Sequence, residues 1–120
     1  MDTMAREGII LNRHYSYPWC APSRAALMTG RMPHDGFENM GQIIPQDVDM
    51  LSHAMKAAGY STHHVGKWHL GLLHAWEYPA ARGFDSSLGF MGGSVDYVTQ
   101  VPAGDRLGVR VRVVSGSGQG

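Results

Sequence analysis

A lone cysteine followed by an arginine is the first pattern in the chain whose spacing could support chemistry. Cys20 precedes Ala21, Pro22, Ser23 and Arg24, and proline is favoured in the first turn of a helix because its missing N–H costs nothing there. A helix N-terminus offers free N–H groups and the positive end of the helix dipole, which favour a thiolate and attract an anion. The planar guanidinium of Arg24, one turn later, fits a tetrahedral oxyanion. The segment therefore predicts a nucleophile beside an anion site, without distinguishing sulfate from phosphate.

A lysine and a histidine two residues apart form the second candidate group. Lys67 and His69 flank Trp68, and in an extended segment alternate side chains face the same side. They follow a predicted strand, and the carboxyl ends of strands are where ligand-binding residues gather in open α/β sheets. Histidine is suited to proton transfer near neutral pH. We expect Trp68 to pack inward and to fix the direction of its two neighbours.

Apolar spacing and glycines predict the elements that must position these two groups. Residues 23–29 are compatible with a helix that Gly30 ends. An apolar stripe with helical spacing predicts a second helix over residues 51–58, buried along that stripe and closed by Gly59. Residues 60–65 then predict the strand that leads to Lys67, and this order of helix, turn and strand is typical of an α/β fold. The stripe consists of Leu51, Ala54, Met55 and Ala58.

Weaker signals predict the remaining elements. Residues 1–8 favour the last turns of a helix, and the apolar residues 9–11 favour a short buried strand. Residues 72–93 are expected to be loop with short pieces of structure. Valine and arginine alternate over residues 109–114, which favours another strand, and the Gly/Ser-rich residues 115–120 favour a flexible tail.

Length and charge restrict the class of protein. The chain has 120 residues, which suits one small domain. Ten acidic and ten basic residues leave no net charge, so neither a nucleic acid nor an anionic membrane is expected as a partner. No apolar stretch indicates a membrane span or a signal peptide, which leaves the compartment unassigned. Because Cys20 is the single cysteine, an internal disulfide is excluded.

Two long segments resemble the signature segments of the sulfatase family. The first runs from Cys20 to Arg31 and begins Cys-Ala-Pro-Ser-Arg, and the second runs from Gly59 to Gly71 and contains Gly-Lys-Trp-His. Residues 82–85 and 93–97 resemble the stretch that follows in arylsulfatases of the N-acetylgalactosamine-4-sulfatase (arylsulfatase B) type. The resemblance predicts a partial sulfatase catalytic domain at residues 1–100 and a divergent tail at 101–120. It implies an α/β fold, as a fragment of an alkaline-phosphatase-like α/β sandwich.

The resemblance implies a specific chemistry for Cys20 and its partners. In the family the motif cysteine, here Cys20, is oxidised to formylglycine by a separate formylglycine-generating enzyme. One hydroxyl of the hydrated aldehyde attacks sulfur, and the second then expels sulfate, which splits one difficult step into two. By the same resemblance Arg24 would hold the diol, Lys67 would bind the diol and a sulfate oxygen, and His69 would take the proton from the second hydroxyl.

The resemblance also implies a calcium ion, most of whose ligands this chain does not supply. Family members bind Ca2+ through oxygen ligands that include an Asp-Asp pair, and the sequence contains no such pair. Cys20, as formylglycine, would be a metal ligand here. We therefore expect a sulfuric ester hydrolase by family that is incomplete and inactive as this isolated chain. The implied substrate is a sulfate ester, with sulfated glycans as candidates, and family members are lysosomal, secretory or periplasmic.

Two other functions stay open from the residues alone. Cys20 could remain a thiol nucleophile with a histidine base, as in cysteine hydrolases, or the chain could be a non-catalytic or binding fragment. Thiol alkylators would inactivate the first, whereas an aldehyde would react with hydrazides. His63 and His64 are adjacent on a predicted strand and point to opposite faces, so they are not expected to share a metal. Arg82 and Asp85 are expected to brace a loop near the site without taking part in the chemistry.

Overall fold

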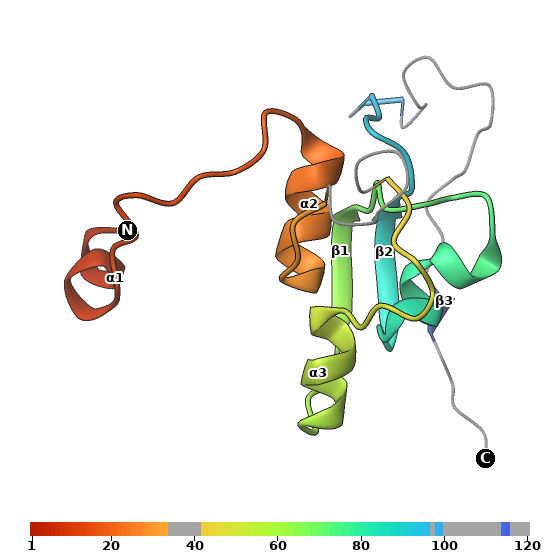
Figure 1. Cartoon of the computed structure of the whole chain (residues 1–120), viewed down its shortest axis with the longest axis horizontal. Helices are drawn as coiled ribbons and strands as arrows, with labels where there is room; N and C mark the ends of the chain where they lie inside the picture. Colours follow the sequence, from red (N-terminus) through yellow and green to blue (C-terminus); the bar gives the residue numbers. More distant parts are fainter. Residues whose placement is uncertain (34–41, 97, 100–113, 116–120) are drawn as a thin grey trace.

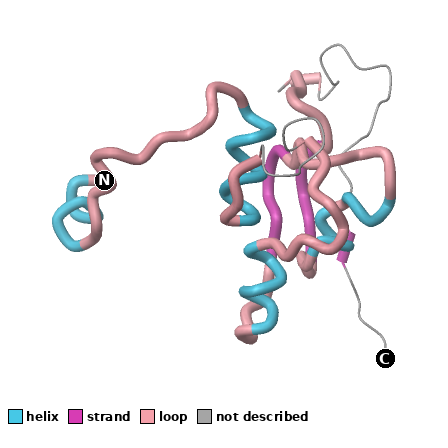
Figure 2. Tube along the Cα trace, in the orientation of Figure 1, coloured by secondary structure: helices cyan, strands magenta, loops and turns pink. Residues whose placement is uncertain are grey.

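The computed structural model describes residues 1–33, 42–96, 98–99 and 114–115. In chain order the elements are α1 (Asp2–Glu7), α2 (Cys20–Thr29), α3 (Leu51–Ala57), β1 (His63–Lys67), the 3-10 turns η2 (Ala75–Glu77) and η3 (Pro79–Arg82), β2 (Ser86–Phe90) and β3 (Val114–Ser115). Helices α2 and α3 lie beside a small sheet (Figure 1, Figure 2), which confirms the predicted α/β class. No helix within these ranges is long and apolar enough to cross a membrane.

A sheet of three strands in the order β1-β2-β3 lies at the centre of the described part. β1 and β2 are parallel, with residues 63–67 paired to residues 86–90, and β3 is antiparallel to β2. Gly66 and Gly89 are partners across the parallel pair, and a Cβ on Gly89 would lie 1.7 Å from the Gly66 carbonyl oxygen. Only glycine at position 89 therefore allows the two strands to approach this closely.

The strands differ from the sequence prediction in two respects. β1 begins at His63 rather than at residue 60, and β2 lies in a segment predicted to be mostly loop. Ser86, Ser87 and Gly89 are poor strand formers, so β2 depends on pairing with β1 and not on its own composition. The strand predicted at 109–114 falls mostly outside the described residues, within which Val114 belongs to β3. The predicted flexible tail also falls outside them, except for Ser115 in β3.

Helix α2 carries the cysteine at its first residue. The helix begins at Cys20 with no side-chain cap, Pro22 is its third residue, and Ala21, Pro22 and Ala25 form its buried side. Gly30 ends it in the left-handed conformation at φ 67°, and its N–H donates to the Ala26 carbonyl at 2.9 Å. The predicted end is confirmed, and the helix starts two residues before Pro22, where the proline predicted its beginning, because proline is tolerated throughout a first turn.

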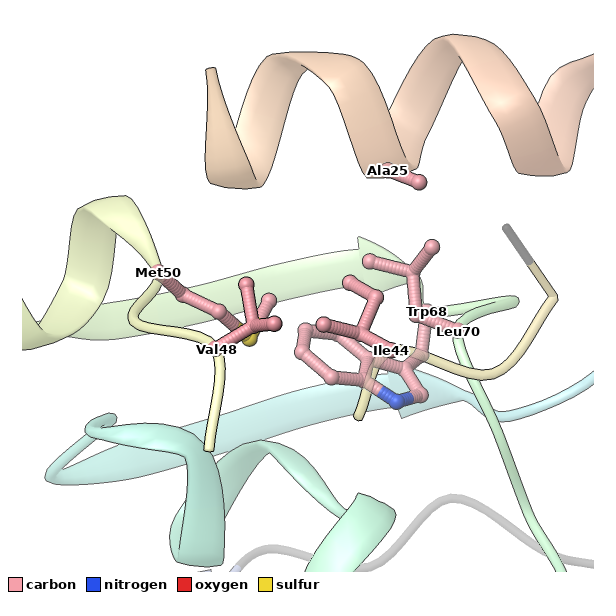
Figure 3. Close-up of a cluster of buried hydrophobic side chains, with 6 residues drawn as sticks. All are labelled: Ala25, Ile44, Val48, Met50, Trp68 and Leu70. Carbon is pink, nitrogen blue, oxygen red and sulfur yellow. The ribbon is translucent and has the colours of Figure 1, made fainter. Parts of the chain in front are cut away.

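The core is supplied largely by the segments that flank helices and strands. Figure 3 shows Ala25 of α2 facing the side chains of five other buried residues. The segment at 45–48 contributes to this cluster and is held by Arg82. The Arg82 guanidinium donates to three backbone carbonyls of that segment at 3.0–3.2 Å. The prediction that Arg82 braces a loop is therefore confirmed. The cluster consists of Ala25, Ile44, Val48, Met50, Trp68 and Leu70.

Helix α3 begins at the predicted residue and ends one residue earlier than predicted, at Ala57, but it buries the other face. Its buried residue is Ser52, whose hydroxyl donates to the Arg82 carbonyl. Leu51 and Met55, from the predicted apolar stripe, are 51% and 36% exposed. The prediction of a buried stripe is wrong in this structure, because contacts of Ser52 with the turn at η3 determine which face of α3 packs inward.

Residues 9–11 do not form the buried strand that the sequence predicts. They follow α1 in an extended segment that lies away from the sheet (Figure 1), and Ile9 is 90% exposed. A strand needs a neighbouring strand to pair its N–H and C=O groups, and within the described residues no backbone hydrogen bond of this segment to the sheet occurs.

Candidate active site

The N-terminus of α2 and the carboxyl end of β1 bring all four predicted site residues together. Cys20 Sγ lies 3.2 Å from His69 Nδ1, although the two residues are 49 positions apart in the chain. Backbone hydrogen bonds continue beyond β1, from Trp68 N–H to the Phe90 carbonyl at 2.8 Å and from His69 N–H to the Met91 carbonyl at 3.0 Å. The parallel strand pair therefore fixes the backbone that presents Lys67 and His69.

Cys20 is exposed at the start of α2 and lies in a cationic environment. Interaction with the Lys67 ammonium as a donor lowers the pKa of Cys20, burial acts in the opposite direction, and the charge of Lys67 and nearby backbone N–H groups add to the lowering. The thiol thus has more thiolate character near neutral pH than a free cysteine. The position is chemically suited to an anion or to a nucleophile.

Arg24 contacts the protein backbone at this site. Its Nε donates to the Trp68 carbonyl at 2.7 Å, and its Nη2 donates to the Lys67 carbonyl. Burial lowers the pKa of Arg24, while the nearby negative charge of the Cys20 thiolate raises it. Arg24 therefore ties α2 to the end of β1 and at the same time holds a positive charge near Cys20.

His69 combines partial burial with two cationic neighbours. Burial lowers the pKa of its imidazole, and the charges of Lys67 and Arg24 lower it further. The imidazole is consequently neutral at pH 7 and able to accept a proton. His69 adopts a positive φ of 55°, so its backbone leaves the extended conformation assumed in the sequence argument, yet both it and Lys67 reach Cys20.

Trp68 packs inward between these two residues, as predicted. Its side chain is 1% exposed, and its indole N–H donates to the backbone carbonyl of Glu77 at 2.8 Å. Its ring makes edge contacts with His64 and Phe84, with centroids 5.2 and 6.0 Å away. His63 is exposed and bonds to Ser86, so the adjacent histidines lie in different environments. This packing orients the segment from Lys67 to His69.

Glu77 is a residue that the sequence analysis missed. It is 1% exposed, and its Oε2 accepts hydrogen bonds from the backbone N–H groups of Leu73 at 2.7 Å and His74 at 3.2 Å. It also lines a cavity of about 400 Å³ that His69 borders. A glutamate in a loop normally indicates a solvated charge, so no local signal distinguished it.

The described residues do not by themselves form a calcium site. Among them, no group of three His, Cys, Asp or Glu side chains lies close enough together to hold a metal ion. Since Ca2+ takes six to eight oxygen ligands, position 20 could at most contribute one part of such a site. Calcium therefore enters none of the steps assigned to these side chains.

Comparison with known proteins decides the family, because residues 1–105 match the family described as sulfatase. The chain belongs to the sulfatase family. The family prediction is thereby confirmed, while the 4-sulfatase type within it is not shown. Relatives that are 36–42% identical carry names of several sulfatase types, including steryl-sulfatase of Mus musculus.

Similar proteins share this segment of a longer chain. Arylsulfatase J of Mus musculus is 40% identical over 106 residues, which cover 82% of this sulfatase chain and 18% of the relative. N-acetylgalactosamine-6-sulfatase of Homo sapiens is 41% identical over 105 residues, which cover 74% and 20%. The crystal structure of Ps i-CgsB superposes with a TM-score of 0.60 at 39% identity, covering 68% of this chain and 19% of that one. The chain thus spans 18–20% of the length of these relatives, and its α/β arrangement is part of a sulfatase domain.

Proposed function

We propose that this chain is the nucleophile-bearing portion of a sulfuric ester hydrolase in which Cys20 becomes formylglycine. The observation that carries the proposal is the position of Cys20, exposed at the first residue of α2 with His69 3.2 Å away and with Lys67 near enough to lower the pKa of the thiol. Hydrated formylglycine at this position supplies one hydroxyl to attack sulfur and a second to release sulfate. The surrounding cationic and proton-accepting groups fit such a nucleophile.

Each of the other three residues has a task that follows from its environment. Lys67 binds a sulfate oxygen, since its positive charge lies near enough to position 20 to lower the pKa of the thiol. His69 takes the proton of the second hydroxyl, because its lowered pKa keeps the imidazole neutral at pH 7. Arg24 adds positive charge near the nucleophile while its two bonds to the 67–68 backbone hold the groups in place.

A sulfated glycan is the substrate class that we propose within the sulfate esters. Ps i-CgsB, 38% identical over 68% of this chain, has been solved in complex with k-i-k-neocarrahexaose. The resemblance of residues 82–85 and 93–97 supports an enzyme of the N-acetylgalactosamine-4-sulfatase type. The missing calcium ligands would come from parts of the protein beyond the described residues.

Peptide mass spectrometry after co-expression with a formylglycine-generating enzyme tests the proposal. The peptide that contains Cys20 is expected to exchange its thiol for an aldehyde and to react with a hydrazide reagent. Cys20→Ala is the matched control and is expected to give no labelling. A chain that keeps its thiol, while a known sulfatase is converted in the same cells, would overturn the proposal.

A thiol hydrolase is the second candidate, and the Cys20–His69 contact at 3.2 Å is the observation that favours it. That function predicts ester hydrolysis by the unmodified chain and its loss on treatment with iodoacetamide. The sulfatase proposal predicts neither. It also predicts that the isolated chain hydrolyses an aryl sulfate no faster than Cys20→Ala, because the described residues do not form a calcium site, and rapid turnover would contradict that expectation.

A further inference from the structure

Glu77 is a buried carboxylate to which the proposed chemistry assigns no task. Its side chain is 1% exposed, and its Oε1 is buried without a hydrogen-bond partner among the described residues. Burying a polar atom without a hydrogen-bond partner is energetically unfavourable. The bonds that Glu77 does make must therefore offset that cost, and all of them lead to the segment that follows β1.

Glu77 accepts three hydrogen bonds from this segment. Trp68 stands between the site residues Lys67 and His69, and its indole N–H donates to the Glu77 backbone carbonyl at 2.8 Å. The N–H groups of Leu73 and His74 donate to Oε2. Glu77 thus contacts the backbone or side chains of residues on both sides of His69.

Close packing at Gly71 couples Glu77 to His69 more directly. Gly71, two residues after His69, has a φ of +111°, and a Cβ there would lie 2.7 Å from Glu77 Cβ and 2.8 Å from Oε2. The Glu77 side chain therefore occupies the inside of the turn that follows His69. A shift of Glu77 would change both the turn and the indole contact.

We propose that Glu77 is a positioning residue, which holds the Lys67–His69 segment in place against Cys20. It acts through Trp68 on one side of His69 and through the turn at Gly71–His74 on the other. The role requires a hydrogen-bond acceptor at Oε2, because this oxygen accepts the bonds from the Leu73 and His74 N–H groups. The inference rests on the proposed function for the roles of Lys67 and His69, but the arrangement itself exists in the unmodified chain.

The pH dependence of Cys20 alkylation in the full chain tests this role. Iodoacetamide reacts with the thiolate, so the rate against pH reports whether Lys67 and His69 lie against the sulfur. Glu77→Ala is expected to move the profile to higher pH and to reduce the rate at pH 7 by about threefold or more. Glu77→Gln keeps an acceptor oxygen and is expected to retain the native profile. Glu7→Ala, in the exposed helix α1, is the control for loss of a carboxylate.

Each outcome of this comparison decides the proposal. A folded Glu77→Ala chain with the native profile would overturn it, and so would a Glu77→Gln chain that shifts as far as Glu77→Ala. If circular dichroism shows that Glu77→Ala unfolds, Glu77→Asp decides instead, since its shorter carboxylate cannot keep the same contacts. A native profile in folded Glu77→Asp overturns the proposal. The alkylation assay uses the unmodified thiol, so its result does not depend on formation of the aldehyde. A failure to form the aldehyde would be seen in the peptide mass spectrum and would count against the proposed function alone.

Discussion

Replacing Gly89 with alanine is expected to separate β1 from β2 and to displace the site residues at the end of β1. The new Cβ would lie 1.7 Å from the Gly66 carbonyl oxygen, and 2.6 and 2.9 Å from two further backbone atoms of Gly66. Because real Cβ contacts do not fall below 3.0 Å, the carbonyl must move by at least 1.3 Å. The obstacle is backbone, so no side-chain rotation can relieve it.

The size of the effect follows from the hydrogen bonds that this movement breaks. The bonds from Trp68 N–H to Phe90 and from His69 N–H to Met91 are 2.8 and 3.0 Å long, and a further 1.3 Å takes both beyond hydrogen-bonding distance. Together with the neighbouring bonds of the ladder, at about 0.5–1.5 kcal/mol each, their loss destabilises the fold by about 2–4 kcal/mol. Lys67 would also retreat from Cys20.

Urea denaturation followed by circular dichroism measures this difference. Gly92→Ala is the matched control, because a Cβ at position 92 meets nothing within 4 Å, and its free energy of unfolding should stay within about 0.5 kcal/mol of the native value. Iodoacetamide labelling of Cys20 provides a second readout, which should slow in Gly89→Ala and not in Gly92→Ala. Equal stability of the two variants, with unchanged labelling of Cys20, would refute the close approach of β1 and β2 as the basis of the site.

Three further perturbations test other contacts. Lys67→Met removes the hydrogen bond that contributes most to lowering the pKa of Cys20, so the alkylation profile should shift to higher pH and the rate at pH 7 should fall by about threefold or more; an unchanged profile would contradict the assignment. Arg82→Met leaves three backbone carbonyls without their donor and should cost about 3 kcal/mol in urea denaturation. Asp85→Asn should lower the Tm at neutral pH, because Lys56 and the backbone of Thr62 hold the pKa of Asp85 at about 2. Since this pKa lies below the ordinary value near 3.9, the stabilisation is fully present well above pH 4 and declines as the pH falls through about 2, so the Tm difference should be largely lost at that pH.

The ends of two helices could be predicted from the sequence, because a glycine ends a helix through the backbone conformation of that single residue. Gly30 and Gly59 adopt positive φ where the sequence indicated the ends of α2 and α3. The face of α3 could not be predicted in the same way. The apolar stripe at 51–58 is a property of the helix alone, whereas its orientation depends on Ser52 bonding to Arg82, thirty residues later.

The site residues themselves were predicted from motif and spacing, and the structure adds how they are held. Cys20 and His69 come from segments whose types and order the sequence displays, but their contact requires α2 and β1 to pack together. Neither Glu77 nor β2 could be recognised from the sequence. Glu77 acquires its role through its contact with Trp68, and β2 is a strand because it pairs with β1. Long-range pairing is therefore the information that the sequence pattern lacked.

Arg24 donates hydrogen bonds to the Lys67 and Trp68 carbonyls, so the same guanidinium supplies the positive charge and holds α2 against the end of β1. A neutral substitution would release the strand end from the helix as well as remove a cation. Lysine would preserve the charge but lacks the planar fork that spans two adjacent peptide groups. An enzyme built on this segment should thus be sensitive even to a charge-conserving exchange at Arg24, through the loss of alignment between nucleophile and base.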